Sequence, residues 1–353
     1  MYLCKICNKE KLISKNLGIC VECIREKPEI AIIYANEVHK KIREKFNLPS
    51  FPPKIENGVK CNICDNQCII GIGEKGYCGL RENVNNFLKS KVSSDTAVCD
   101  FYYDLIPTNC CASWFCKADK EGKGKYNLAV FFYGCSFNCL FCQNYSHKFI
   151  EKGNILQSEQ LLKKAISEKV YCVCFFGGSP EPHFPFVIKF SEEILKLKKI
   201  RICFEWNGIG NEFFVRKVGE ITLKSKGIIK FDLKAFDENL NIVLTGISNK
   251  KTYENFKIIG KEILPKADYP LLTATTLLVP GYIDEIEVEK IAKFISDINP
   301  EIPYSLLVFF PEFYMNDLPI TPKETVYNAF NVAKKYLKNV HIGNIHLLDI
   351  FKI

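Results

Sequence analysis

The sequence predicts an α/β protein: a partial βα barrel preceded by a small cysteine-rich, metal-binding region. From about residue 126, apolar strand-like runs alternate regularly with amphipathic helical stretches. Before that point the pattern is irregular, and residues 1–125 carry twelve of the eighteen cysteines in short clusters. With 353 residues, 47% of them hydrophobic, the chain is long enough for one large domain and a smaller one.

The strand candidates of the second part are mostly continuous apolar runs, as expected where both faces of a parallel sheet are covered. They lie at 127–133, 170–176, 200–206, 227–233, 271–279, 303–310 and 340–346. The helices expected between them lie at 158–168, 186–199, 211–225, 250–264, 284–297 and 322–337. Because six βα units are about two short of the eight-fold barrel, we expect a (βα)6-type partial TIM barrel over residues 126–353.

The first part of the chain divides into two modules. Residues 1–28 are predicted to form a zinc-ribbon-like module. Residues 29–125 are predicted to contain a helix at 29–47, a stiff proline-rich linker after it, and a second cysteine-rich module.

The formal net charge of +8 comes from lysines that are spread along the predicted helices. Nucleic-acid-binding surfaces gather their basic residues on one face with aromatic residues between them, so we do not expect nucleic acid as a partner. No apolar run approaches the roughly 20 residues of a membrane-spanning helix. Because the first residues also lack a signal-peptide pattern, we expect a soluble, cytoplasmic protein without membrane contact.

Eighteen cysteines indicate metal or redox chemistry, because a chain of this length does not need disulfide bonds for its stability. Three of them, Cys172, Cys174 and Cys203, lie in apolar strand-like runs. We expect these three to be buried core residues.

The strongest motif consists of Cys135, Cys139 and Cys142, spaced C-x3-C-x2-C directly after the first predicted barrel strand. Three thiolates in one short loop can ligate three irons of a four-iron cubane cluster, which leaves the fourth iron free to bind a substrate. The loop lies where βα barrels gather their chemistry, at the C-terminal ends of the strands. Zinc is the alternative, because it takes four ligands and His147 is near enough in sequence to supply the fourth.

This motif, with Phe141 before its last cysteine, resembles the signature of radical S-adenosylmethionine (SAM) enzymes. The resemblance covers about residues 127–349 and extends back through the second cysteine cluster. Within that superfamily the chain is similar to the pyruvate formate-lyase activating enzymes and their uncharacterised archaeal and bacterial relatives. The stretches that carry the resemblance are Cys142-Gln143-Asn144, Phe175-Phe176-Gly177-Gly178-Ser179-Pro180-Glu181-Pro182-His183, Phe204-Glu205-Trp206-Asn207-Gly208, Lys230-Phe231-Asp232-Leu233-Lys234-Ala235-Phe236, Leu278-Val279-Pro280-Gly281-Tyr282 and Ile342-Gly343-Asn344-Ile345-His346-Leu347-Leu348.

The resemblance implies an oxidoreductase whose [4Fe–4S] cluster cleaves SAM reductively. The resulting 5′-deoxyadenosyl radical would abstract a hydrogen atom, and the similarity to activating enzymes favours a glycine of a partner protein as its source. A ferredoxin- or flavodoxin-type protein would donate the electron. The alternatives are radical modification of another peptide or a small molecule, and a catalytically inactive zinc-ribbon binding or scaffold protein.

The resemblance also implies a set of SAM-binding residues, namely Phe141, Gly177, Gly178, Ser179, Glu205, Asn207, Asp232 and Lys234. The glycine pair has no side chains, so backbone groups can approach the methionyl amine. In the activating enzymes the positions that match Glu205 and Asp232 help to bind a monovalent cation beside the methionyl carboxylate. Lys234 can pair with that carboxylate directly, and residues 232 and 234 point to the same side of a strand.

The sequence departs from the family pattern at two positions. Ser179 stands where many members have a glutamate after the glycine pair, and Phe310 stands where the activating enzymes tend to have a histidine. Both substitutions bear on how the cofactor is held.

Two further four-cysteine sets precede the barrel. Cys4, Cys7, Cys20 and Cys23 form two C-x2-C pairs separated by twelve residues. This spacing is close to that of zinc ribbons, so we expect a closed, structural zinc site, with a second iron–sulfur cluster as the rival. The second set comprises Cys61, Cys64, Cys68 and Cys78. Its ligand count fits zinc and an auxiliary four-iron cluster equally.

A last group of cysteines lies just before the predicted barrel. Cys110, Cys111 and Cys116 follow one another closely, with Cys99 upstream. They form either a third metal site or a set of thiols that pack near the barrel.

Overall fold

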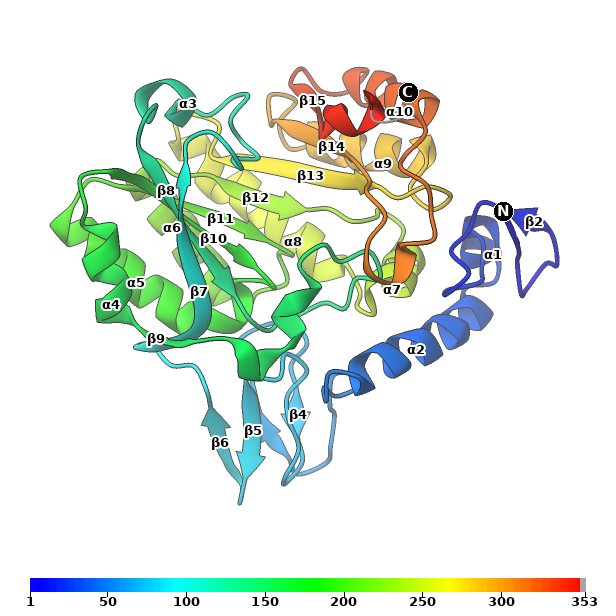
Figure 1. Cartoon of the computed structure of the whole chain (residues 1–353), viewed down its shortest axis with the longest axis horizontal. Coiled ribbons are helices and arrows are strands. Elements are labelled where there is room, and N and C mark those ends of the chain that lie inside the picture. The colour runs from blue at the N-terminus through cyan, green and yellow to red at the C-terminus, as the bar shows by residue number, and fades with distance from the viewer. Residues whose placement is uncertain (350–353) are drawn as a thin grey trace.

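The computed structural model describes residues 1–349, and a nine-stranded sheet forms the centre of the molecule (Figure 1). Within that range the sheet contains seven parallel strands, and each pairs with the next along the chain. These are β8 (Tyr126–Phe132), β10 (Val170–Gly177), β11 (Arg201–Trp206), β12 (Ile229–Asp232), β13 (Leu272–Leu278), β14 (Tyr304–Val308) and β15 (Val340–Gly343). All seven coincide with predicted strands, so the predicted partial βα barrel is confirmed.

Helices connect these strands, as expected for right-handed βα crossovers. They are α4 (Ser158–Ala165), α5 (Phe184–Leu197), α6 (Glu212–Ser225), α7 (Glu238–Thr245), α8 (Lys250–Ile258), α9 (Glu285–Ser296) and α10 (Lys323–Lys334). The six predicted helices are present, and α7 is an addition. Asp237 caps its start by accepting a hydrogen bond from Leu240 N at 2.8 Å, and Gly246 ends it with φ of 77°.

The core lies between the sheet and its helices and is rich in phenylalanine. Phe175 on β10 stacks on Phe132 of β8 with 5.7 Å between ring centroids, and its edge meets Phe190 of α5. All three side chains are completely buried. Burial of each such ring contributes about 2–3 kcal/mol, so this cluster holds α5 against the first barrel strands.

Two antiparallel strands extend the sheet beyond β8. Strand β7 (Thr96–Leu105) pairs with the whole of β8, from Cys99 opposite Phe132 to Leu105 opposite Tyr126. Strand β9 (Ile155–Gln157) pairs with the start of β7 and covers its outer edge. The sheet therefore begins about thirty residues before the expected domain boundary at residue 126. The aromatic run Phe101–Tyr103 favoured a strand there, but the clustered cysteines around it masked that signal.

The N-terminal region consists of short elements around one long helix. A hairpin of β1 (Tyr2–Leu3) and β2 (Glu10–Lys11) precedes α1 (Val21–Glu26) and α2 (Pro28–Glu44), which corresponds to the predicted helix at 29–47. Helix α2 packs against α7 of the barrel. Two small hairpins follow and project from the body of the molecule, as Figure 1 shows. They are formed by β3 (Val59–Lys60) with β4 (Ile69–Ile70), and by β5 (Arg81–Val84) with β6 (Phe87–Ser90), while the short helix α3 (Ala118–Glu121) comes just before β8.

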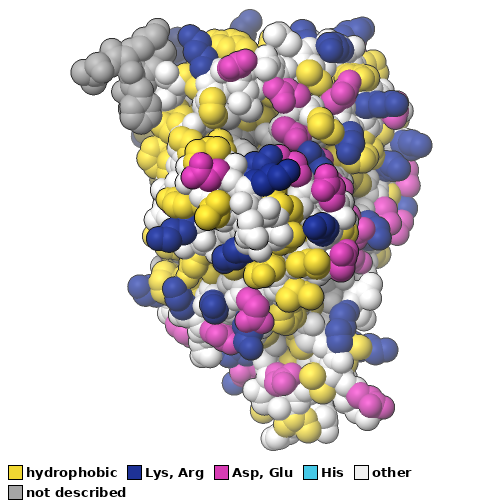
Figure 2. Space-filling model, turned by 90° about the vertical axis from the view of Figure 1, so that its right-hand side faces the viewer, with side chains coloured by type: hydrophobic (Ala, Val, Ile, Leu, Met, Phe, Trp, Pro, Cys, Tyr) yellow, Lys and Arg dark blue, Asp and Glu magenta, His cyan; other side chains and the backbone are white. Residues whose placement is uncertain are grey.

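Charged side chains of both signs are interspersed on the face shown in Figure 2, and neither sign gathers into a continuous patch there. Many form exposed ion pairs, such as Lys11 with Glu22. Such pairs contribute little to stability. In the part of the chain that the structure describes, every helix is too short or too polar to cross a membrane.

Candidate active site

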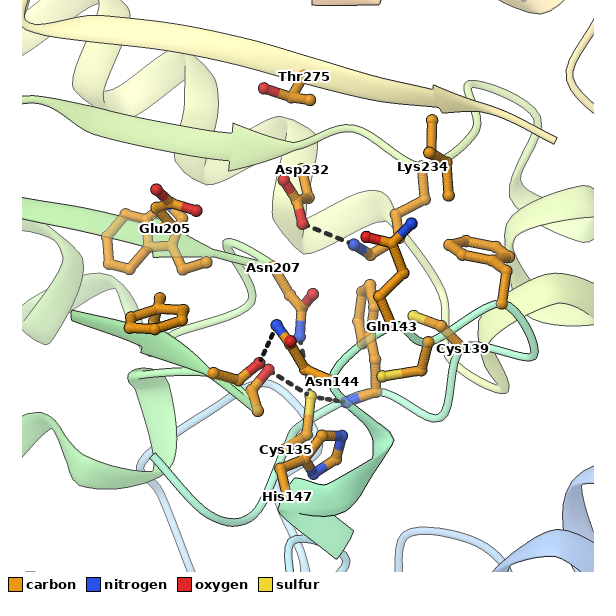
Figure 3. Close-up of a pocket in the computed structure, with 18 of the residues that line it drawn as sticks. Cys135, Cys139, Gln143, Asn144, His147, Glu205, Asn207, Asp232, Lys234 and Thr275 are labelled. Atoms are coloured by element: carbon orange, nitrogen blue, oxygen red, sulfur yellow. Dashed lines mark hydrogen bonds and ion pairs between the residues drawn. The ribbon is translucent and has the colours of Figure 1, made fainter. Parts of the chain in front are cut away.

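A cavity of about 240 Å³ opens at the C-terminal ends of the parallel strands. The loop after β8 forms one wall, and the ends of β10, β11 and β12 form the opposite one (Figure 3). Active sites of βα barrels lie at this end of the strands, because the loops that follow them converge there. The cavity is therefore the candidate active site.

The three cysteines of the C-x3-C-x2-C motif all line this cavity, although they come from different points of the loop. The sulfur of Cys135 accepts hydrogen bonds from Phe137 N at 3.4 Å and from Asn207 Nδ2 at 3.2 Å. Its own S–H donates to Gly178 O at 3.1 Å. Donors directed at a sulfur stabilise a thiolate, which is the form that binds metal.

Burial dominates the protonation of these thiols. It raises the pKa of Cys135 and of Cys139 to about 11 each, and it also raises the pKa of Cys142. The buried ammonium group of Lys148 opposes this effect and lowers the pKa of all three. Without a metal, the three groups are therefore neutral thiols at pH 7, and a bound metal must displace their protons.

A chain of buried hydrogen bonds fixes the loop from behind. Lys148 Nζ donates to Asn138 Oδ1 at 2.7 Å, and Asn138 Nδ2 lies 2.8 Å from His39 Nδ1 on α2. The other ring nitrogen of His39 lies 3.0 Å from the carbonyl oxygen of Val243 on α7. The backbone N–H of Asn138 donates to Thr245 O at 2.8 Å. Helices α2 and α7 thus hold the cysteine loop in one conformation.

His147 lies beside the triad and lines the cavity (Figure 3). Burial holds the pKa of its imidazole well below the usual range, so the ring is neutral, and its buried Nδ1 has no hydrogen-bond partner. Within residues 1–349, however, the three cysteines and His147 do not form a group whose ligand atoms all lie within 4.8 Å. A single zinc ion bound by these four residues would require that proximity.

The glycine pair at the end of β10 makes a close backbone contact with the cysteine loop. A Cβ on Gly178 would stand 2.2 Å from the carbonyl oxygen of Gly134, and Gly177 has φ of 109°. Any larger residue at position 178 would push the triad loop away from the sheet. The pair therefore sets the distance between β10 and the cysteines, and the backbone contact to a ligand that the sequence suggests stays a prediction.

Ser179 is the one implied cofactor residue that does not line the cavity. Its hydroxyl is buried and donates to the carboxylate of Glu181, which also accepts a hydrogen bond from Gly208 N at 2.8 Å. Glu181 is completely buried, and burial raises its pKa. A carboxylate is thus present two residues after Ser179, but it ties the β10 loop to the loop after β11.

Opposite the triad, four charged side chains form a continuous ion-pair network. Lys230 Nζ lies 2.9 Å from Glu205 Oε2 and 3.3 Å from Asp232 Oδ1, and Lys234 Nζ lies 2.8 Å from Asp232 Oδ2. Burial raises the pKa of Asp232, but the two lysines lower it more strongly, to about 2. Burial lowers and Asp232 raises the pKa of Lys234, which is shifted upward overall. Asp232, Lys230 and Lys234 therefore carry their charges at neutral pH.

The structure adds residues to the cavity that the sequence did not single out as contacts. They include Gln143, Asn144, Phe176, Trp206, Lys230 and Thr275. Lys230 was detectable, because alternation along β12 places residues 230 and 232 on one face. Thr275 carried no such signal, since it lies in an apolar strand and meets Asp232 only through the register of β12 with β13. Phe310, the second departure from the family pattern, lies outside the cavity and is 45% exposed.

The N-terminal cysteines Cys4, Cys7, Cys20 and Cys23 form a compact group. Their sulfurs all lie within 4.8 Å of one another, with Cys4 to Cys23 at 3.8 Å and Cys7 to Cys20 at 3.9 Å. A tetrahedral zinc ion with Zn–S bonds of about 2.3 Å has sulfur–sulfur separations of about 3.8 Å. The geometry is therefore that of a site for a single ion.

This N-terminal group is docked firmly on the barrel. Tyr282 accepts a hydrogen bond from Ser14 N at 3.0 Å and donates one to Ile19 O at 3.1 Å. Arg25 forms ion pairs with Asp284 at 2.8 Å and with the buried Glu287 at 3.1 Å. The four cysteines lie outside the active-site cavity, and Arg25 of α1 joins this module to the start of α9.

The second cysteine set is brought together beside the triad loop. Cys61, Cys64, Cys68 and Cys78 line one small cavity with Tyr77. Asn66 Nδ2 donates to Ser136 O at 2.8 Å, and a Cβ on Gly134 would stand 2.9 Å from Cys78 O. Among the described residues, this set does not reach the close spacing of the N-terminal group.

The last group of cysteines is divided by the fold. Cys99 is buried on β7, opposite Phe132. Cys110, Cys111 and Cys116 instead line a separate cavity together with Cys172, Cys174 and Cys203. The last three were expected in the core, and they are indeed largely enclosed, but they face a cavity rather than packed side chains.

Comparisons with known proteins found a matching family model and several relatives. The family model described as the radical SAM superfamily matches residues 129–295, from β8 to α9. A putative glycyl-radical enzyme activating enzyme of Methanocaldococcus jannaschii is 30% identical over 220 residues, which cover 60% of this chain and 79% of the relative. The pyruvate formate-lyase 1-activating enzyme of Escherichia coli K12 is 23% identical over 237 residues, covering 61% and 91%.

A third relative, an uncharacterised protein of M. jannaschii, is 27% identical over 304 residues and covers 82% of each chain. Among solved structures, a domain of pyruvate-formate lyase-activating enzyme from Bacteroides vulgatus superposes with a TM-score of 0.41 at 19% identity. It covers 49% of this chain and 98% of its own. Streptococcus suis SuiB bound to the precursor peptide SuiA superposes with a TM-score of 0.47 at 18% identity, covering 61% and 47%.

Proposed function

This chain belongs to the radical SAM superfamily, and on that premise we propose that it activates a partner protein by removing a hydrogen atom from one of its glycines. One observation carries the proposal: three cysteines line one wall of the cavity, and a network of charged side chains lines the opposite wall. Three thiols leave one position open on a four-iron cluster, and the network offers charges to a zwitterionic ligand of that position.

The residues present fit a cluster and SAM. Cys135, Cys139 and Cys142 face one cavity without the close spacing of a single-ion site. One buried polar atom of a residue that lines this cavity, His147 Nδ1, has no hydrogen-bond partner. Buried polar groups are almost always paired in native proteins, so this atom is consistent with a ligand in the cavity.

We assign the cluster to the three cysteines and SAM to the space between them and the network. When bound, the cluster supplies the electron that cleaves the sulfonium–carbon bond of SAM, and the 5′-deoxyadenosyl group then takes a hydrogen atom from the substrate. Lys234 is placed to pair with the methionyl carboxylate, and Asp232 holds Lys234 in position at 2.8 Å. Asp232 and Glu205 also offer oxygens to a monovalent cation.

Other residues of the chain set the charge and position of the cluster. Asn207 donates to the sulfur of Cys135, and the buried Lys148 places a positive charge behind all three thiols. Both effects favour thiolates and a reduced cluster, which carries extra negative charge. Phe141 lines the cavity next to Cys142 and excludes water from it.

A glycine of a protein as hydrogen donor is supported by the relatives. Two proteins that share substantial parts of this chain are named as activating enzymes. We further propose a ferredoxin- or flavodoxin-type electron donor and a cytoplasmic location, since a reduced four-iron cluster needs both a one-electron source and a reducing compartment.

We propose a structural zinc ion for the N-terminal group and an auxiliary cluster for Cys61, Cys64, Cys68 and Cys78. The sulfur separations of 3.8 and 3.9 Å support zinc at the first. The second set has wider spacing and lies against the backbone of Gly134, directly before the triad. The buried guanidinium of Arg43 lies near both this second set and the triad, since the charges of Cys68, Cys78 and Cys135 all act on its pKa.

The proposal is tested in two steps with protein reconstituted anaerobically with iron and sulfide. In the first, dithionite and SAM are added, and 5′-deoxyadenosine is measured. We expect its formation by the wild type and its loss in Cys139→Ala. Absence of product from wild-type protein with a verified full cluster would instead support an inactive scaffold protein.

The second step identifies the source of the hydrogen atom. Proteins extracted from source cells grown on α-deuterated glycine are added as substrate, and the deuterium content of 5′-deoxyadenosine is measured. We expect deuterium in the product. Substrate-dependent turnover without deuterium would contradict the glycyl assignment, and it would leave the radical SAM chemistry intact.

A further inference from the structure

A second cavity, of about 50 Å³, lies inside the barrel on the far side of the charged network from the active site. Glu205 and Lys230, joined by an ion pair of 2.9 Å, line both cavities and separate them. Six cysteines surround the second cavity, namely Cys110, Cys111, Cys116, Cys172, Cys174 and Cys203. A third of the cysteines in the chain thus converge on one small space.

The cavity is closed by the segment between β7 and α3, which crosses the N-terminal end of the barrel. Trp114 in this segment donates to Ser305 Oγ on β14 at 3.2 Å. Its ring stacks on that of His341 on β15, with 5.0 Å between centroids. Ser305 and His341 are each the second residue of their strands, so the segment covers the strand ends opposite the active site.

The strand cysteines face the cavity because of the sheet geometry. Cys174 on β10 pairs in register with Cys203 on β11, and Cys172 lies two residues before Cys174. Residues two apart on a strand share a face, and residues in register share it too. The loop cysteines then approach from the end of the barrel, so two independent parts of the chain supply thiols to the same place.

The six thiols divide into two groups. Cys111 donates to Glu205 Oε1 at 3.0 Å, and Cys174 lies 3.8 Å from the same oxygen. The other four, Cys110, Cys116, Cys172 and Cys203, line the cavity without a hydrogen bond to this carboxylate. In addition, Ala118 N donates to the sulfur of Cys116 at 3.4 Å, a contact that stabilises a thiolate.

Ordinary core packing does not account for this arrangement. Protein interiors leave few voids larger than a water molecule, and one water needs only about 10–15 Å³ of such space. Larger apolar side chains at these positions would close the cavity. A space of this size with six thiols among its lining residues is instead suited to a soft metal centre.

We propose that Cys110, Cys116, Cys172 and Cys203 bind an iron–sulfur cluster inside the barrel. Within the described residues, only the N-terminal group has the close spacing of a single-ion site, so the wider arrangement here favours a cluster over zinc. None of the four residues lines the active-site cavity. The proposal therefore stands or falls independently of the function proposed above.

The test uses full-length protein in which Cys135, Cys139 and Cys142 are all replaced by alanine, so that the active-site cluster is absent. Iron and sulfide per chain are measured after anaerobic reconstitution, together with the electron paramagnetic resonance (EPR) spectrum of the reduced protein. Adding Cys110→Ser and Cys116→Ser should remove about four irons and four sulfides per chain. The matched control Cys99→Ser, a buried cysteine on β7, should remove none.

Two further variants keep the result interpretable. Cys61→Ser with Cys64→Ser removes two ligands of the auxiliary site. When these changes are combined with Cys110→Ser and Cys116→Ser, the proposal predicts that the iron lost equals the sum of the losses in the two separate variants. Cys203→Ser alone replaces one strand ligand if the loop variant fails to fold, as judged by circular dichroism. Unchanged iron and sulfide in a folded Cys110/Cys116 or Cys203 variant would overturn the proposal, as would zinc without sulfide in the cavity.

Discussion

The N-terminal cysteine group and the triad loop use the same side chain in opposite ways. In the first, four sulfurs approach to within 4.8 Å of one another, as a closed four-ligand site requires, and the group lies outside the active-site cavity. In the second, three thiols are spread along one wall of a 240 Å³ cavity, facing a network of four charged side chains. A metal whose coordination positions are all filled by protein ligands stabilises the fold, whereas a metal with a free position can bind a substrate. In this chain the spacing of the cysteines, rather than their number, therefore distinguishes a structural site from a catalytic one.

The largest expected effect follows from removing one cysteine of the triad. In Cys139→Ala, two thiols remain at the cavity, and a cubane cannot be held there. We expect loss of 5′-deoxyadenosine formation to below detection, together with loss of about four irons per chain. Product formation and iron content are measured on the same sample, with Cys99→Ser as the control that keeps both. Full activity of the alanine variant would contradict the assignment of this loop.

A smaller effect is expected at the charged network. Asp232→Asn keeps the shape of the side chain but leaves the buried Lys230 and Lys234 with one fewer anion. We expect the affinity for SAM to fall about tenfold, equivalent to about 1.4 kcal/mol, with cluster content unchanged. Equilibrium binding of SAM to the reconstituted protein measures this, and Asp268→Asn on the exposed surface is the control. An affinity equal to that of the wild type would show that the network does not contact SAM.

The pH dependence of stability tests the role of His39, which helps to hold the triad loop in place. Burial lowers the pKa of His39 to about 4, so the folded protein keeps this ring neutral while the unfolded chain protonates it near 6.5. The free energy of unfolding is therefore unaffected by His39 above pH 6.5, and it falls by roughly 3 kcal/mol as the pH is lowered to about 4. Urea unfolding of the metal-free protein at several pH values should show this slope, and His39→Gln should flatten it. Parallel curves for the two proteins would indicate that His39 is not buried in its neutral form.

The smallest effect on catalysis is expected at the closed site. Cys23→Ser removes one ligand of the proposed zinc ion, which lies outside the active-site cavity, so zinc content and thermal stability should fall. SAM cleavage per intact active-site cluster should stay within about twofold of the wild type, because the cavity residues are untouched. Zinc analysis, a melting curve and 5′-deoxyadenosine formation separate these outcomes. A loss of cleavage as large as that of Cys139→Ala would remove the distinction between the two regions.

The sequence predicted the fold well because its signals were local. Hydrophobic runs and their order located all seven parallel strands, and cysteine spacing located the triad and the N-terminal group. Helix α7 was missed, although Asp237 and Gly246 marked its ends. Strand β7 was missed because its pairing with β8 lies across a connection of about twenty residues that is dense in cysteines.

The parts of the site that escaped prediction depend on contacts between distant segments. Thr275 joins the cavity only through sheet register, and Lys148 faces the triad only because the loop folds back on itself. The cysteines of β10 and β11 looked like core residues, since nothing in the local sequence shows that the 110–116 segment closes the barrel over them. The cofactor roles of Phe141, Gly177, Gly178, Glu205, Asn207, Asp232 and Lys234 remain predictions, and Ser179 lies outside the cavity.

The account depends most on an open iron at the triad, and electron–nuclear double resonance tests this directly. The reduced, reconstituted protein is mixed with SAM that carries ¹⁵N at the methionyl amine and ¹⁷O at the carboxylate. We predict strong coupling of both nuclei to the cluster in the wild type and in Cys99→Ser. Bound SAM without coupling from either nucleus would mean that the cluster has no free position for it, and the central claim would be wrong.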